Sequence, residues 1–93
     1  MTYEAPKKRI VCNDGFSMSV QANEYAYCSP RVTGLGFYDE YEVGFPSREE
    51  PLLTPFAENP GNLTGTVYGY VPVAAIVEVI AKHGGVKGED NTL

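Results

Sequence analysis

Carboxylates and aromatic rings alternate in residues 37–45, which read FYDEYEVGF. Residues two apart share a face of an extended strand, so Glu40 and Glu42 lie together with Tyr38. Such paired carboxylates can serve as general acid and base when a pocket separates their pKa values. The surrounding sequence gives no sign of a pocket. We therefore favour a solvated acidic face that contacts another protein through Tyr38, Glu40 and Glu42.

Two cysteines and one histidine are the other residues that could carry chemistry. Cys12 or Cys28 would be a nucleophile only beside a base such as His83, and neither lies in a recognisable activating context. A zinc site built from all three would lack a fourth ligand and the usual Cys-x-x-Cys spacing. His83 instead suits the negatively charged C-terminal end of an expected helix. We expect buried free thiols, no metal, no cofactor and no enzymatic activity.

The chain has 93 residues, of which 43% are hydrophobic and 20% are charged. These values are typical of one soluble globular domain with a single core. We expect one domain over residues 1–93, with flexible tails at 1–8 and 87–93. No apolar run reaches the ~20 residues that span a bilayer, and the N-terminal residues are polar. The expected location is cytoplasmic.

The net charge of −5 is unevenly distributed. Between residues 31 and 70, two arginines are set against six carboxylates, which are Asp39, Glu40, Glu42, Glu49, Glu50 and Glu58. Such a surface repels nucleic-acid phosphates and attracts basic proteins. The chain also has seven tyrosines, a residue type enriched at protein interfaces. We expect a protein partner with a basic surface, no direct nucleic-acid binding and no membrane binding.

Alternating polar and apolar residues predict the strands that position these groups. A strand at 9–12 leads into a turn at 13–15, and a second strand follows with four inward residues, which are Phe16, Met18, Val20 and Ala22. In the stretch 37–45, alternation places Tyr41, Val43 and Phe45 inward and leaves Tyr38 exposed. In a fourth strand at 66–71, Tyr68 and Tyr70 share one face.

The segment 46–65 contains four prolines and reads as a long loop. Ser47 and Glu50 match a capping box that predicts one helical turn, ended by a proline. Apolar residues later in the loop, which are Leu52, Leu53 and Phe56, should hold it against the body. Glu49 and Glu50 would then extend the acidic surface.

A helix is expected after Pro72, with a stop at Gly84 and Gly85. Its apolar stripe consists of Val73, Ile76, Val77, Val79 and Ile80. The sequence therefore predicts an α+β fold, in which an antiparallel sheet of about four strands has one C-terminal helix packed on one face.

The chain resembles a family of small uncharacterised proteins encoded by bacteriophages and prophages, over residues 10–85. The segments that carry the resemblance are 12–22 (CNDGFSMSVQA), 27–31 (YCSPR), 42–47 (EVGFPS) and 67–73 (VYGYVPV). The resemblance implies a setting in which small acidic proteins bind host machinery, as anti-CRISPR proteins do. It implies no catalytic residues.

These observations lead to three functional hypotheses. The first is a non-enzymatic inhibitor that binds a basic host protein, such as a CRISPR effector, through Tyr38, Glu40, Glu42, Glu49 and Glu50. The second is a structural or accessory module that forms a small homo-oligomer through its tyrosines. The third is an enzyme that acts through Cys12, Cys28 or His83.

Overall fold

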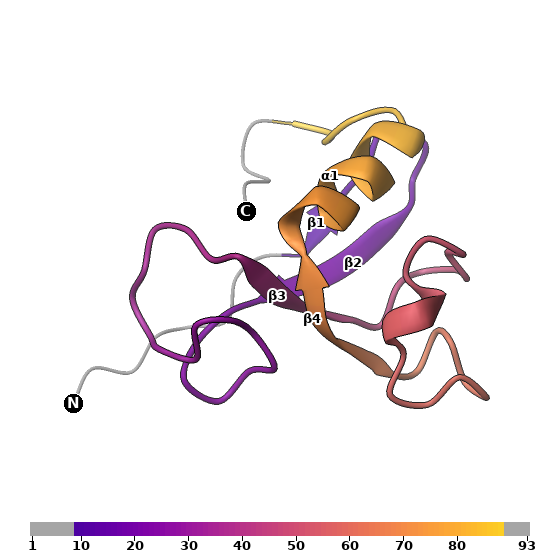
Figure 1. Cartoon of the computed structure of the whole chain (residues 1–93). Coiled ribbons are helices and arrows are strands. Elements are labelled where there is room, and N and C mark those ends of the chain that lie inside the picture. Colours follow the sequence, from indigo (N-terminus) through magenta and orange to yellow (C-terminus); the bar gives the residue numbers. More distant parts are fainter. Residues whose placement is uncertain (1–8, 89–93) are drawn as a thin grey trace.

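The structure is a computed structural model, and it describes residues 9–88 (Figure 1). Its elements in chain order are β1 (Ile10–Val11), β2 (Ser17–Gln21), β3 (Glu40–Gly44), the 3-10 helix η1 (Thr54–Phe56), β4 (Val67–Pro72) and α1 (Val73–Lys82). The strands form one sheet in the order β1-β2-β3-β4, and every neighbouring pair is antiparallel. Helix α1 packs against β4. The predicted α+β architecture is confirmed.

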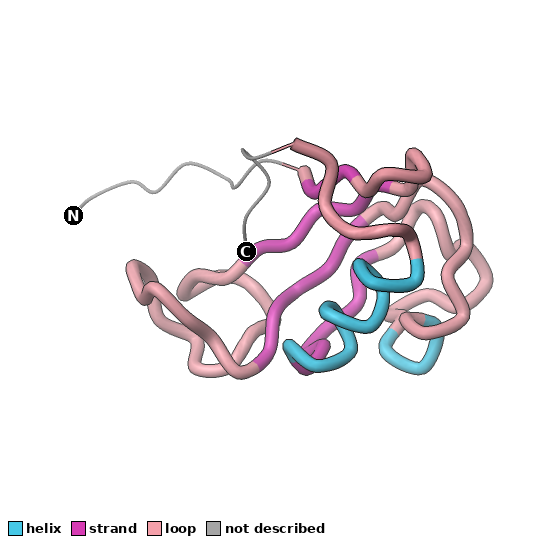
Figure 2. The backbone as a smooth tube through the Cα atoms, turned by 90° about the horizontal axis from the view of Figure 1, so that it is seen from above, coloured by secondary structure: helices cyan, strands magenta, loops and turns pink. Residues whose placement is uncertain are grey.

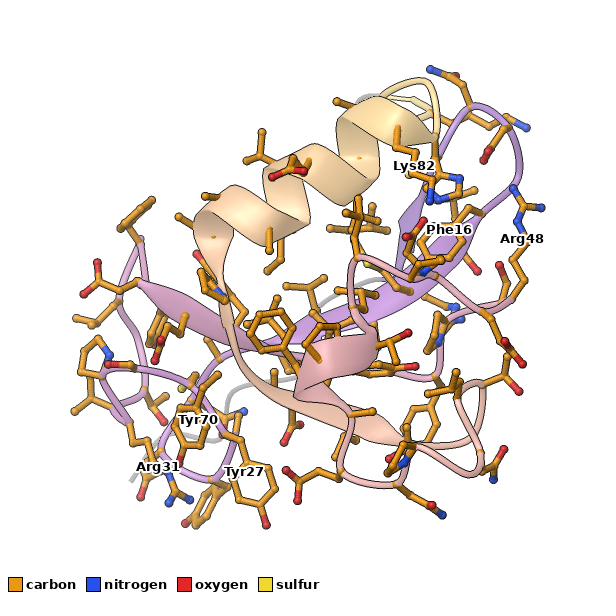
Figure 3. All side chains as sticks on the ribbon, turned by 45° about the vertical axis from the view of Figure 1, so that its right-hand side comes forward. Phe16, Tyr27, Arg31, Arg48, Tyr70 and Lys82 are labelled. Atoms are coloured by element: carbon orange, nitrogen blue, oxygen red, sulfur yellow. The ribbon has the colours of Figure 1, made fainter. Side chains whose placement is uncertain are left out.

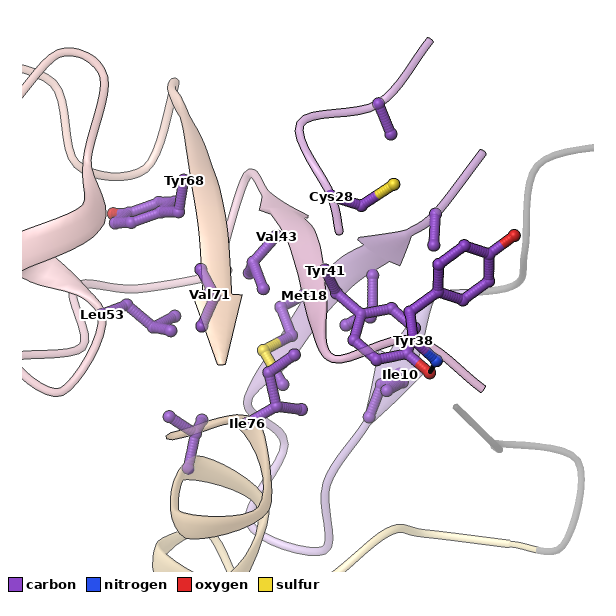
Figure 4. Packing of buried hydrophobic residues seen from close by; sticks show 14 of the residues in the cluster. Ile10, Met18, Cys28, Tyr38, Tyr41, Val43, Leu53, Tyr68, Val71 and Ile76 are labelled. Atoms are coloured by element: carbon purple, nitrogen blue, oxygen red, sulfur yellow. Dashed lines mark hydrogen bonds between the residues drawn. The ribbon is translucent and has the colours of Figure 1, made fainter. Parts of the chain in front are cut away.

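One face of the sheet and the helix enclose the core (Figure 4). The four residues predicted to point inward from the second strand are all buried, and they are Phe16, Met18, Val20 and Ala22. Ile76 and Val79 of α1 are also fully buried, and Val73 and Ile80 pack against the core edge. Val77 is 54% exposed, so its predicted place in the stripe is wrong. The helix ends at Lys82 with His83 as its C-cap, and Gly84 and Gly85 follow with positive φ, as predicted.

The stretch 37–45 departs from simple alternation at both ends. Strand β3 begins at Glu40, so alternation does not extend back to Tyr38. The expectation that Tyr38 is exposed is wrong, because its ring is 2% exposed and packs edge-on against Tyr41. Phe45 was expected in the core but is 50% exposed, because the chain turns there with φ of 49°. Tyr41 and Val43 are buried as expected.

Strand β4 contains a β-bulge. Tyr68 pairs with Val43 and Val71 pairs with Tyr41, so Gly69 and Tyr70 together oppose a single residue, Glu42. The extra residue reverses the alternation. Tyr68 is fully buried, whereas Tyr70 is 43% exposed. The prediction that these two tyrosines share a face is therefore wrong.

The 46–65 loop is ordered against the body, as Leu53 shows by its complete burial. Leu52 and Phe56 pack against the core edge. The capping box is not formed, because Ser47 exchanges hydrogen bonds with Ser17 instead. The helical turn lies later, at η1.

Residues near the two ends of the described chain lie side by side. Val86 forms a bridge with Cys12, and the Lys87 N–H donates to the Val11 carbonyl at 2.8 Å. The expected tail 1–8 and all but the first two residues of the expected tail 87–93 lie outside the described residues. Between residues 9 and 88, no helix is both long and apolar enough to cross a membrane.

Candidate functional site

The bulge in β4 is fixed by a segment distant in sequence. The Tyr70 N–H donates to the Tyr27 carbonyl at 2.9 Å, and the Tyr27 N–H donates to Oε2 of Glu42 at 3.2 Å. Tyr27 also lies close over Gly69, where an added Cβ would be 3.3 Å from the Tyr27 Cβ. Glycine at this position lets the two segments approach each other. Strand β3, the bulge and residue 27 are thereby joined.

Tyr70 has φ of 53°, in the left-handed region that costs a residue with a Cβ about 1–2 kcal/mol. Glycine adopts positive φ more readily than any residue with a side chain. The tyrosine side chain is nevertheless directed outward and is 43% exposed. Strained backbone that holds a large exposed side chain is a recognised mark of functional sites.

The rings of Tyr27 and Tyr70 form an exposed pair, with centroids 6.1 Å apart and planes tilted by 33°. Cζ of Arg31 lies 5.7 Å from the centroid of the Tyr27 ring. Figure 3 shows Tyr27, Arg31 and Tyr70 together at one end of the molecule, whereas Phe16, Arg48 and Lys82 lie at the other.

The 23–37 loop carries most of the other exposed apolar side chains. Eight large apolar side chains are exposed in the described part of the chain, and six of them lie in the 23–37 loop or in the bulge. We call these six the aromatic surface; they are Tyr25, Tyr27, Val32, Leu35, Phe37 and Tyr70. Figures 1 and 2 show this loop projecting beside the sheet, away from α1. Exposed apolar patches on small proteins mark interaction sites.

Carboxylates border the aromatic surface. Oε2 of Glu42 accepts the Tyr27 N–H. The backbone of Glu40 is joined to the loop, because its carbonyl accepts the Ser29 N–H at 3.0 Å. A carboxylate oxygen of Glu58 lies 3.5 Å from the position of a Cβ on Gly69. Glu24 belongs to the loop itself and is exposed. An apolar centre with a charged rim is the usual composition of a protein interface.

The structure separates the five residues expected to bind a partner. Glu40 and Glu42 are partly exposed and lie beside the aromatic surface. Tyr38 is buried, and its hydroxyl donates to the Val32 carbonyl at 2.7 Å. This hydrogen bond holds the 23–37 loop against the core. Glu49 is exposed, but Glu50 is 1% exposed and points toward the C-terminal end of α1. Glu50 therefore cannot contribute to a contact surface in this conformation.

Sequence reasoning missed Tyr27 and Tyr70 as members of the site. The available signal was the irregular segment 23–36, which carries two tyrosines and has no period that would bury them. A second signal was Gly69, because a glycine inside a strand often marks a bulge or a close backbone approach.

A second cluster lies around His83, whose side chain is 8% exposed. Its ring stacks on Phe16 at 4.2 Å. Nδ1 lies 2.6 Å from Oδ2 of Asp14, and Nε2 lies 2.6 Å from Oε1 of Glu50. An ionised carboxylate can only accept hydrogen bonds, so both contacts are satisfied together only when both ring nitrogens carry protons. The ring then joins the 13–15 turn, the 46–53 part of the loop and the end of α1.

Two further cations extend this cluster. Arg48 pairs with Asp14 at 2.9 Å, and Lys82 pairs with Glu50 at 3.0 Å. Hydrogen bonds from the Phe16 N–H and then from His83 lower the pKa of Asp14 below its ordinary value. Burial alone would raise the pKa of Glu50, but bonds from the Leu52 N–H, His83 and Lys82 together lower it. Both carboxyl groups are thus held in the ionised form.

The His83 cluster has the composition of a structural ion network and lacks a nucleophile. Cys12 is nearby in sequence, but burial and then the charge of Asp14 raise the pKa of its thiol. Cys12 and Cys28 are both buried and free, as expected. Among residues 9–88, no group of three or more His, Cys, Asp or Glu residues could hold a metal ion. The arrangement holds the fold together and keeps Glu50 inside.

Comparisons with known proteins identify no relative: no family model, no curated protein and no solved structure matches this chain.

Proposed function

We propose that this protein is a non-enzymatic inhibitor or adaptor that binds a basic protein surface through the aromatic surface and its carboxylate rim. The observation that carries the proposal is the strained Tyr70 in the β4 bulge, which keeps an aromatic ring exposed at a positive φ that glycine adopts more readily. Together with Tyr70, five exposed apolar side chains of the 23–37 loop supply contact area, and the net charge of −5 favours a basic partner.

The proposed contact differs from the one expected from sequence. Tyr27 and Tyr70 replace Tyr38, and Glu58 replaces Glu49 and Glu50 at the rim. Glu40 and Glu42 remain in the proposed contact because they lie beside the 23–37 loop. Tyrosine at the centre of such a contact contributes large contact area at low entropic cost.

Charge reversal at matched positions tests the proposal. The immobilised full chain captures proteins from a nuclease-treated bacterial lysate, and the affinity of the main captured protein is then measured at two salt concentrations. We expect the double variant Glu40→Lys/Glu58→Lys to lose about tenfold in affinity. The control variant Glu49→Lys/Glu78→Lys makes the same change in charge at exposed positions outside the rim, and it should retain binding.

An equal loss of affinity in the two double variants would show that net charge alone causes the effect. That result would contradict a defined contact. Recovery of nucleic acid alone, from a lysate without nuclease, would contradict the electrostatic argument. A captured second copy of this chain would favour the homo-oligomer, and a mass that rises with concentration would confirm that outcome.

Inhibition of a CRISPR effector is the specific case that we propose within this class. Its support is the acidic composition, which suits a surface that normally holds nucleic acid. The test is cleavage of target DNA by purified effectors with increasing amounts of the protein. Inhibition that is lost in Glu40→Lys/Glu58→Lys and kept in the control would support it, and unchanged cleavage would exclude the effectors tested.

A further inference from the structure

The exposed tyrosine pair already holds a cation from its own chain. The guanidinium carbon of Arg31 lies 5.7 Å from the centroid of the Tyr27 ring, within the range of a cation–π contact. The Tyr70 ring lies beside the Tyr27 ring, and the two centroids are 6.1 Å apart. Figure 3 shows the three side chains grouped at one end of the molecule.

Arg31 is an exposed residue, and no carboxylate forms a salt bridge with it within the part of the chain that the structure describes. Arg48, in comparison, lies 5.9 Å from the Phe16 ring and also pairs with Asp14 at 2.9 Å. A cation–π contact at an exposed site is weak, so another cation can displace Arg31 at low cost.

We infer that Tyr27 and Tyr70 form a subsite for an arginine side chain of the partner, which Arg31 occupies in the free protein. The inference rests on the proposed function and specifies the chemistry of its partner. Arg31 then acts as an internal competitor, and partner binding exchanges one guanidinium for another.

Two carboxylates lie near the backbone of the pair and are available to a guanidinium that enters from a partner. Oε2 of Glu42 lies at the Tyr27 N–H, and Oε2 of Glu58 lies 3.5 Å from the position of a Cβ on Gly69. A guanidinium can stack on a ring with its flat face while its edge donates to a carboxylate. A lysine ammonium is more strongly hydrated and has no flat face, so the subsite should prefer arginine.

Titration of the full ¹⁵N-labelled chain with a hexa-arginine peptide, followed by NMR, tests the subsite. We expect Tyr70→Ala to weaken binding by about two- to five-fold, and the amide shifts to centre on residues 27 and 70. Tyr25→Ala is the matched control, because it removes an exposed ring from the 23–37 loop and leaves both rings of the pair in place. Equal affinities of the Tyr70 and Tyr25 variants would overturn the subsite.

The competitor role makes a prediction of opposite sign. Arg31→Gln should bind hexa-arginine more tightly than Arg48→Gln, although the two variants lose the same charge. Equal affinity in these variants would overturn the role of Arg31. A hexa-lysine peptide that binds as tightly as hexa-arginine would overturn the preference for guanidinium.

Failure of the subsite is distinguishable from failure of the proposed function. If hexa-arginine does not contact the pair while the captured partner still protects the aromatic surface, only the arginine inference is wrong. If the captured partner protects another face, the proposed function and the inference are both wrong.

Discussion

The Tyr70 amide donates a hydrogen bond to the Tyr27 carbonyl at 2.9 Å, so the two exposed rings are joined through their backbones. A flexible loop that presented the same rings would lose conformational freedom on binding. Here the bulge in β4 and the bond from Tyr27 to Glu42 fix the pair before any partner arrives. The pair is thus preorganised by the sheet.

Backbone strain at Tyr70 predicts an unusual order of stabilities. Tyr70→Ala and Tyr70→Gly both remove the ring, but only glycine relieves the positive φ of 53°. We expect the glycine variant to be more stable than the alanine variant by about 1 kcal/mol, measured by urea unfolding. The pair Phe45→Gly and Phe45→Ala, at φ of 49°, is a second instance and should show the same order. An alanine variant at least as stable as the glycine variant would refute the strain at Tyr70.

The lowered pKa of Glu50 predicts a loss of stability in acid. A carboxyl group whose pKa is lower in the folded chain contributes stability above its ordinary pKa, and this contribution disappears as the pH falls through the folded value. The free energy of unfolding should therefore decrease as the pH falls below about 4. Asp14 has a lowered pKa and acts in the same direction.

Substitution of Glu50 should make this pH dependence shallower. Glu50→Gln is expected to lose about 2 kcal/mol at neutral pH, because a nearly buried, charged hydrogen-bond acceptor is removed. Glu49→Gln changes an exposed carboxylate of the same loop and is the control. Urea unfolding between pH 3 and pH 7 measures both variants. A slope in Glu50→Gln as steep as in the wild type would refute the assignment to Glu50.

The packing of α1 predicts different costs for neighbouring apolar residues. Ile76 is completely buried, so Ile76→Ala should cost about 3 kcal/mol. Val77 is 54% exposed, and Val77→Ala should leave the unfolding midpoint nearly unchanged. Thermal unfolding of the two variants compares them directly, and equal losses would contradict the placement of the helix.

Burial of both thiols predicts slow alkylation. Cys12 and Cys28 are buried, and the pKa of Cys12 is raised by burial and by the charge of Asp14. Iodoacetamide should label neither thiol appreciably in the folded chain and both rapidly in denaturant. Mass spectrometry follows the reaction. Rapid labelling of either thiol in the folded chain at neutral pH would revive the enzyme hypothesis.

Sequence periodicity predicted the regular parts of this fold correctly, for a physical reason. Met18 and Val20 lie in the uninterrupted antiparallel strand β2, where alternate side chains must point to opposite faces, and Phe16 directly precedes that strand. Alternation failed at Tyr70 because the bulge inserts one extra residue, which switches the face of the sheet to which the side chains point. It failed at Tyr38 because the strand begins two residues later.

The site could be predicted only in part. Glu40 and Glu42 follow from strand alternation, but the contact between Glu42 and Tyr27 joins residues 15 positions apart in the chain. Glu50 was misplaced because its partner, His83, is 33 residues away. Long-range pairings of this kind have no local pattern in a single sequence, so they appear only in the fold.

Hydrogen–deuterium exchange of the captured complex tests the central claim most directly. The claim is that the aromatic surface and its rim contact the partner. We predict that the partner protects amides in residues 23–37 and 68–71 and leaves exchange unchanged in α1 and in the 46–53 part of the loop. Protection confined to α1 or to that part of the loop, with residues 23–37 exchanging as in the free protein, would contradict the claim.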